Sequence, residues 1–452
     1  MGKKLHREEI LSGNLAKAFA SLAVPIVANN FIQTMYNLTD TYYLGKLGEE
    51  NQAAITLVSP VQSIVVNFGA GIVAAGAILI SQYLGAKKDE DAKKMATHIY
   101  VASLIFSVIC AMICFFATPA IVNWLGGEDI VKKYATTFLQ IVILDMPFLF
   151  MMNVYQAVNQ SQGNTFRPML LNLLGITLNV ILAPIFMFVF DFGIAGAALA
   201  TLLSKVPCAI IAVISLHNKK NPISVHLPGF RFRKDMLLSI IKVGIPTALG
   251  SSTMQFGFLL MGKSVVEYGT LGTAAYGIGN RVNGLITLPS NAMGSATATI
   301  VGLNIGAGQY DRAEKAYKLS RNASVIFLFV GGLILSREPI ARGLVSIFTD
   351  SSEVATLAAE FLAILALYCW TNGVYNSTIG LFQGSGHTMI TMLVDATRLW
   401  IFRFATLFVC QTVLDMGIQS IWYSVVISNA LSSLVLYVLY RTQRWRVKVI
   451  KV

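Results

Sequence analysis

The sequence predicts an all-α polytopic membrane protein with about twelve transmembrane helices in two pseudo-symmetric six-helix lobes. Of its 452 residues, 55% are hydrophobic and only 12% are charged, whereas a soluble domain carries about 25% charged residues. Apolar stretches of roughly 18 residues or more recur along the chain, and each could cross a bilayer as a helix. The two halves of the chain also resemble one another. These observations exclude a cytosolic globular enzyme.

Charged residues divide the apolar stretches into successive spans. In chain order the predicted spans cover residues 15–45, 52–82, 95–120, 134–160, 166–190, 194–216, 237–267, 273–303, 318–336, 356–382, 390–413 and 418–440. A long hydrophilic break at 217–236 lies near the middle of the chain. We therefore predict an N-lobe over 1–216, a cytoplasmic linker over 217–236, and a C-lobe over 237–452 that ends in a basic cytoplasmic tail.

The basic residues indicate the topology. The net charge is +12, and Lys and Arg concentrate in the N-terminal segment, in every second loop and in the C-terminal tail. The remaining loops hold only a few basic residues, namely Lys46, Lys132, Lys133, Arg337 and Arg342. This asymmetry predicts a multi-pass protein of the cytoplasmic (inner) membrane with both termini in the cytoplasm. Since the basic residues do not gather on one face or arm, we expect no nucleic-acid partner.

The two halves repeat at a nearly constant spacing. A shift of 221 residues pairs Pro25 with Pro246, and a shift of 224 pairs Asp191 with Asp415. Six spans per half is an even number, so both halves insert in the same orientation. A parallel duplication predicts two bundles with a cavity between them.

The first span carries the most ordered set of polar side chains. Asn29, Gln33, Tyr36 and Asp40 are spaced so that all four share one helical face. Ionisable groups at mid-span cost about 2.5 kcal/mol or more and usually face a cavity or a partner. The face could be a helix–helix hydrogen-bond seam, but a seam needs no ionisable group. We therefore favour a water-lined cavity wall with Asp40 as its titratable carboxylate.

Further polar side chains complete the predicted substrate cavity. Beyond the first span, it is predicted to include Asn153, Gln156, Asn172, Gln255, Asn372 and Asn376. Asn179 and Thr201 lie in the fifth and sixth spans. The position equivalent to Asp40 in the second half is Met261, so the carboxylate belongs only to the first half.

Two other acidic residues lie inside the spans. Asp145, in the segment VILDMPF, has no basic residue in its own span. It is therefore expected to be unpaired and is a second candidate for a proton site. Asp395 and Arg398 are three residues apart on one helix and are expected to pair.

The sequence shows no catalytic or metal-binding pattern. It contains neither a phosphate loop of the GxxxxGK type nor an HExxH or GxSxG motif. We therefore expect no enzyme activity, no metal and no cofactor, and we expect an ion gradient to supply the energy.

Several motifs resemble the multidrug and toxic compound extrusion (MATE) transporters, closest to their DinF-like and MepA-like bacterial and archaeal branch. They are YNLTDTYYLGKLG at 36–48, ISQYLGAKKDEDAKK at 80–94, GNTFRPM at 163–169, LNVILAP at 178–184 and GLNIGAGQYDRAEKA at 302–316. The resemblance implies two six-helix lobes around a V-shaped cavity. It also implies alternating-access export of bulky, often cationic amphiphilic drugs in exchange for protons or sodium. We further expect a monomer in the lipid bilayer.

The resemblance also implies roles for particular residues. It places the coupling ion at Asp40, with Asn179 and Thr201 beside it, and the bend of the first helix at Pro25. Where the family motif has a second aspartate, this chain has Ala183. Because sodium prefers several hard oxygen ligands with compensating charge, the loss favours proton over sodium coupling, and Asp145 offers a second acid nearby.

An alternative assignment is a flippase for a lipid-linked or polyprenyl substrate of the same helical superfamily. Its substrate would call for a more basic cavity. Arg281, Arg398 and Arg403 are the residues that hint at one.

Overall fold

The computed structural model describes residues 2–126 and 128–447, and these residues form helices without a strand. Residues 448–452 of the predicted basic tail lie outside the described residues. The predicted class, an all-α polytopic membrane protein, is confirmed.

Nine helical elements form the first half of the chain and precede the linker. Their bounds are α1 Gly2–Ser12, α2 Leu15–Gly45, α3 Glu49–Gly85, α4 Asp89–Leu125, α5 Asp129–Ile143, α6 Met146–Ser161, α7 Phe166–Pro184, η1 Ile185–Val189 and α8 Gly193–His217 in the described residues. The predicted linker begins at His217, the last residue of α8, and contains no further helix until α9 begins at Lys234.

The second half repeats this alternation of long and broken helices. Its elements are α9 Lys234–Val266, α10 Gly269–Gly306, α11 Tyr310–Leu335, α12 Glu338–Val345, α13 Ser352–Tyr368, α14 Trp370–Gly384, α15 Thr388–Ala396, η2 Thr397–Arg403, α16 Phe404–Thr412, α17 Gln419–Arg441 and η3 Arg444–Arg446. Of these, η2 is a π-helical segment.

Each predicted span corresponds to a helical segment. Among the described residues, eight helices are long and apolar enough to cross a membrane, and two bent pairs raise the number to ten. The pairs are α5–α6, bent by 43°, and α13–α14, bent by 54°. The other two predicted spans correspond to α10, which is rich in Gly, Asn and Thr, and to the α15–η2–α16 segment, which carries two arginines.

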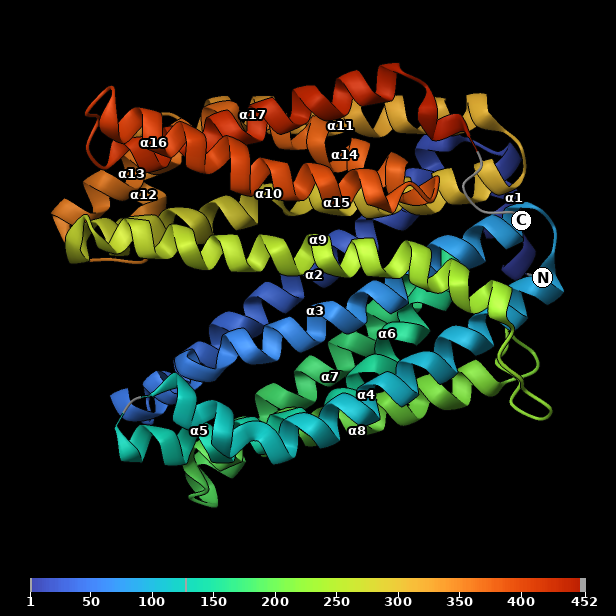
Figure 1. Cartoon of the computed structure of the whole chain (residues 1–452), viewed down its shortest axis with the longest axis horizontal. Helices are drawn as coiled ribbons and strands as arrows, with labels where there is room; N and C mark the ends of the chain where they lie inside the picture. Colours follow the sequence, from blue (N-terminus) through green and yellow to red (C-terminus); the bar gives the residue numbers. More distant parts are fainter. Residues whose placement is uncertain (1, 127, 448–452) are drawn as a thin grey trace. The chain divides into compact units, whose positions relative to one another are not determined.

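The chain forms two compact units. Of the described residues, unit 1 comprises 2–8, 24–126 and 128–248, and unit 2 comprises 9–23 and 249–447. Within unit 1, α3 packs on α4, α5 and α6, while α8 packs on α5, α6 and α7. Within unit 2, α14 packs on α10, α11 and α17 (Figure 1). The lobe bounds predicted from the hydrophilic break, 1–216 and 237–452, stay a prediction.

Two helices of unit 2 pack unusually closely. A Cβ atom added at Gly380 on α14 would lie 2.2 Å from the carbonyl oxygen of Gly294 on α10. One added at Gly294 would lie 2.7 Å from the carbonyl oxygen of Asn376. The absence of side chains at these glycines therefore lets the two backbones meet, which brings the polar face of α14 against α10.

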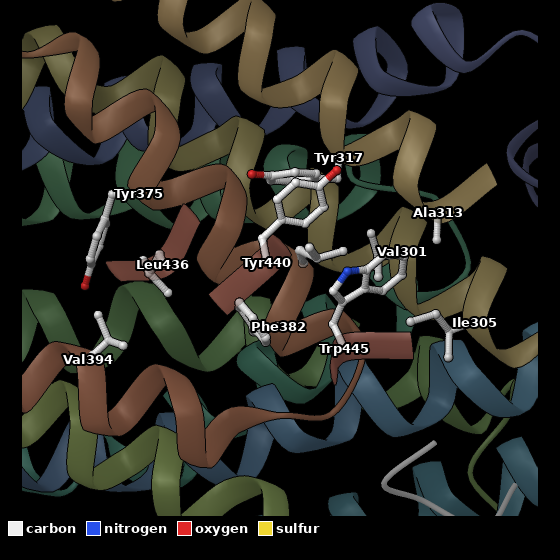
Figure 2. Packing of buried hydrophobic residues seen from close by; sticks show 11 residues of the cluster. Val301, Ile305, Ala313, Tyr317, Tyr375, Phe382, Val394, Leu436, Tyr440 and Trp445 are labelled. Atoms are coloured by element: carbon white, nitrogen blue, oxygen red, sulfur yellow. The ribbon is translucent and has the colours of Figure 1, made fainter. Parts of the chain in front are cut away.

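Aromatic side chains form the core at one end of unit 2. The rings of Tyr317 and Tyr440 have centroids 4.6 Å apart, and Trp445 is fully buried in the same cluster (Figure 2). Tyr440 donates a 2.7 Å hydrogen bond to Glu314, which also forms an ion pair with Arg446. These contacts anchor the segment after α17 to α11.

Candidate functional site

The first predicted span forms the single helix α2, which carries the polar face on unit 1. Asn29, Tyr36 and Asp40 are half-buried, whereas Gln33 is exposed. The side chain of Asn172 on α7 donates a 2.9 Å hydrogen bond to Asn29. One end of the face is therefore held against α7, and Asp40 lies at its other end, about three helical turns further along.

Helices α7 and α8 place two further predicted residues together. The Asn179 amide, which is only 4% exposed, donates a 3.2 Å hydrogen bond to Thr201 Oγ1. Thr201 Oγ1 in turn donates to the carbonyl oxygen of Ala197, at 3.1 Å. The Tyr36 side chain approaches Thr201 from α2. Three helices thus bring oxygen-bearing side chains to one place in unit 1.

Asp145 is paired, which corrects the expectation that it lacks a partner. Lys205 on α8 donates a hydrogen bond to its carboxylate and forms an ion pair with it. The Asp145 side chain is 2% exposed and the Lys205 side chain 22%. Asp145 lies at the bend between α5 and α6. The expectation failed because it considered only basic residues of the same span.

Lys205 connects this ion pair to the other predicted residues. Thr201 and Lys205 are four residues apart on α8 and so share one face of that helix. Asp40 lies within electrostatic range of Lys205, yet its side chain makes no hydrogen bond or ion pair with any other described residue. The cluster therefore holds two carboxylates and one ammonium group, and Asp40 is the carboxylate without a direct partner.

Ala183 lies in an apolar environment. It is 1% exposed and belongs to a core cluster with Leu44, Met187, Ala197 and Ala200. The position that carries a second aspartate in the family motif is therefore packed among hydrophobic side chains in this chain.

The remaining predicted cavity residues of unit 1 are not tied into the cluster. Asn153 and Gln156 are half-buried on α6, and their side chains make no hydrogen bond with another described residue. Pro25 lies inside the continuous helix α2 and is half-buried.

Two predicted cavity residues of unit 2, Asn372 and Asn376, take part in a contact between helices. The Asn376 amide donates hydrogen bonds to Ser290 Oγ at 3.1 Å and to Asn291 Oδ1 at 2.7 Å, both on α10. Ser290 Oγ also donates a 3.1 Å hydrogen bond to the carbonyl oxygen of Asn372. These interactions join α14 to α10, while the Gln255 side chain is exposed on α9.

Asp395 and Arg398 do not form the expected ion pair within the described chain. Asp395 instead accepts a hydrogen bond from Tyr375. The Arg398 guanidinium lies over the Tyr375 ring, 4.3 Å from its centroid, and donates to Asn429 Oδ1 at 2.9 and 2.6 Å. Arg398 lies in the π-helical segment η2, where the wider turn changes the relation between residues three apart.

A second arginine meets the same asparagine. Arg403 is 1% exposed and donates to Ser428 Oγ at 3.1 Å and to Asn429 Oδ1 at 3.2 Å. Its Nη1 atom has no hydrogen-bond partner among the described residues. Two guanidinium groups therefore converge on one amide in unit 2.

Comparison with known proteins identifies related chains along nearly the whole length. The MatE family model matches residues 25–185 and 246–409. The two segments start 221 residues apart, the spacing that pairs Pro25 with Pro246. "Probable multidrug resistance protein YoeA" of Bacillus subtilis is 23% identical over 433 residues, covering 94% of this chain and 93% of the relative.

Two further matches agree with this result. Multidrug export protein MepA of Staphylococcus aureus is 24% identical over 423 residues, covering 92% of each chain. The solved structure of a MOP superfamily transporter from Pyrococcus furiosus is 24% identical, with a TM-score of 0.90 over 96% of this chain and 97% of that one. The structural match bears on the fold alone.

Proposed function

The chain belongs to the MatE family, and from this premise we propose that it exports bulky, often cationic amphiphiles as a proton-coupled multidrug antiporter. Relatives that match over nine-tenths of both chains are named multidrug export or multidrug resistance proteins. The unit 1 cluster contains two carboxylates, and Asp145 is paired with Lys205 whereas Asp40 forms no ion pair with a described residue. This observation carries the proposal.

The composition of the cluster favours a proton as the coupling ion. Asp145 is already neutralised by Lys205, which leaves a single negative charge at Asp40. One proton cancels that charge, whereas sodium prefers several hard oxygen ligands with compensating charge. Ala183 occupies the position where the family motif has a second aspartate, and it is packed among apolar side chains, so this position adds no carboxylate.

The transport cycle follows from linkage between the ion and the drug. A proton that neutralises Asp40 lowers the affinity for a cationic drug, and an ionised Asp40 restores it, so the two ligands exchange. Pro25 lacks a backbone N–H and leaves a weak point in the hydrogen-bond ladder of α2. Repacking of α2 about Pro25 would change access to Asp40. We place both termini in the cytoplasm and propose that a monomer in the cell membrane is sufficient.

The decisive variant is Asp40→Asn. It should abolish export of a cationic dye such as ethidium from proteoliposomes while leaving membrane insertion intact, because the fixed neutral group cannot alternate between charge states. Wild-type protein should export the dye when a pH gradient alone is imposed. Export driven by a sodium gradient at equal pH would overturn the proposed ion, and normal export by Asp40→Asn would overturn the proposed site.

One observation favours a second function, a flippase for a lipid-linked or polyprenyl substrate. Arg398 and Arg403 converge on Asn429, and a pair of guanidinium groups suits a phosphate or pyrophosphate group. Arg281, the third arginine considered, lies exposed on α10. Flipping of a fluorescent polyprenyl pyrophosphate in proteoliposomes, lost in Arg398→Gln, would support this function. Absence of flipping in vesicles that export ethidium would exclude it.

A further inference from the structure

The ammonium group in the unit 1 cluster has no counterpart among the residues that the family motifs assign to the ion site. We propose that Lys205 is a built-in counter-cation that makes the site select protons over sodium. The inference rests on the proposed function, since it names what determines the ion preference of that same site.

The geometry gives Lys205 a fixed place in the cluster. Its ammonium group is bound to the carboxylate of Asp145, whose side chain is 2% exposed. Thr201 lies one turn away on the same face of α8 and holds the Asn179 amide. Asp40 is close enough to interact with the ammonium group without pairing with it.

Oxygen atoms suited to sodium are present in the cluster. Asp40, Asp145, Asn179, Thr201 and Tyr36 all contribute oxygen-bearing side chains from α2, α7, α8 and the α5–α6 bend. Hard cations prefer such ligands together with negative charge. The chemistry of the ligands therefore does not by itself exclude sodium, and the charge balance becomes decisive.

Lys205 sets that charge balance. With Asp40 ionised, the two carboxylates and the ammonium group sum to a single negative charge. A sodium ion at Asp40 would lie near the ammonium group, and like charges repel strongly where water is scarce. A proton instead neutralises Asp40 without placing a second cation beside Lys205. The titratable groups facing Lys205 are Asp145, Asp40 and, through Thr201, Tyr36.

A cycle of four proteins tests the proposal. Wild type, Lys205→Met, Asp145→Asn/Lys205→Met and Lys205→Arg are purified, and their thermal unfolding is measured in sodium chloride against choline chloride. Lys205→Met leaves the charge of the Asp145 carboxylate without its partner. This variant should gain a sodium-dependent rise in unfolding temperature of several degrees. The double variant restores the single negative charge and should lose the response. Lys205→Arg keeps the cation and should behave as wild type.

Efflux provides an independent measurement. Lys205→Met should acquire sodium-stimulated ethidium efflux at equal pH, at least threefold above its efflux in choline, and the other three proteins should not. Lys263→Met, which removes a lysine of α9 that has no partner in the described structure, serves as the matched control and should remain insensitive to sodium.

The outcomes separate this inference from the proposed function. If wild type exports dye on a pH gradient and Lys205→Met shows no sodium response in either measurement, the role of Lys205 is wrong and proton coupling stands. An equal sodium response in Lys205→Met and in the double variant would also overturn the proposed role of Lys205. If Lys205→Met does not fold, Lys205→Gln takes its place. A sodium response of Lys205→Gln that is lost in Asp145→Asn/Lys205→Gln supports the proposal, and absence of a sodium response in Lys205→Gln refutes it.

Discussion

Lys205 on α8 forms an ion pair with Asp145, which lies 60 residues earlier in the chain at the bend between α5 and α6. The acid is nearly fully buried, whereas the lysine retains 22% of its side-chain exposure. The loss of stability should therefore depend on which of the two partners is removed.

Removing either partner should destabilise the protein, and removing the lysine should cost more. Breaking a buried ion pair by deleting one partner costs about 3–5 kcal/mol, because the other charge is left uncompensated. We expect Lys205→Met, measured without sodium, to approach this range and Asp145→Asn to cost less, since the remaining ammonium group can reach solvent. Thermal unfolding in detergent checks the order. A smaller loss for Lys205→Met than for Asp145→Asn would contradict it.

Thr201 should support the site through its hydroxyl group. In Thr201→Val the Asn179 amide loses its 3.2 Å acceptor in a nearly buried position, which costs about 1–3 kcal/mol. We expect ethidium efflux to fall at least fivefold while the protein still inserts. Thr201→Ser keeps the hydroxyl and serves as the matched control. Unchanged efflux in Thr201→Val would show that the hydrogen bond is dispensable.

Restoring an acid at position 183 should not create a working ion site. Ala183 is packed among apolar side chains, and an unpaired carboxyl group there costs at least about 2 kcal/mol. We expect Ala183→Asp to lower the unfolding temperature without introducing sodium-driven efflux. Ala183→Ser introduces a smaller polar group and should have a milder effect. A stable Ala183→Asp protein with sodium-stimulated efflux would show that the position still belongs to the site.

The close approach of α10 and α14 should depend on glycine. Gly380→Ala would place a methyl group 2.2 Å from a backbone oxygen of Gly294, and overpacking of this kind costs about 1–3 kcal/mol. The matched control is Gly331→Ala on α11, where a Cβ atom meets nothing within 4 Å. Thermal unfolding of both variants in detergent should show a loss only for Gly380→Ala. Equal stability of the two proteins would indicate that the helices can separate without cost.

The sequence by itself determined the helical class and the position of most of the apolar helical segments. Both depend on the length and apolar content of each segment, which are local properties of the chain. The shared face of Asn29, Tyr36 and Asp40 was predictable for the same reason, since the pitch of one helix fixes which of its residues lie together. The even spacing of the two halves also required only the order of residues.

The tertiary structure decided the partners of the charged and polar groups. Asp145 meets a lysine from another helix, and Asp395 accepts a hydrogen bond from Tyr375 although Arg398 lies three residues away. Asn376 joins α14 to α10. A side chain buried between helices must satisfy its charge or hydrogen bonds with whatever group the packing brings near it. That group belongs to a distant part of the chain. The packing of the helices, and not the spacing of residues along any one of them, therefore left Asp40 as the carboxylate of the unit 1 cluster without an ion pair among the described residues.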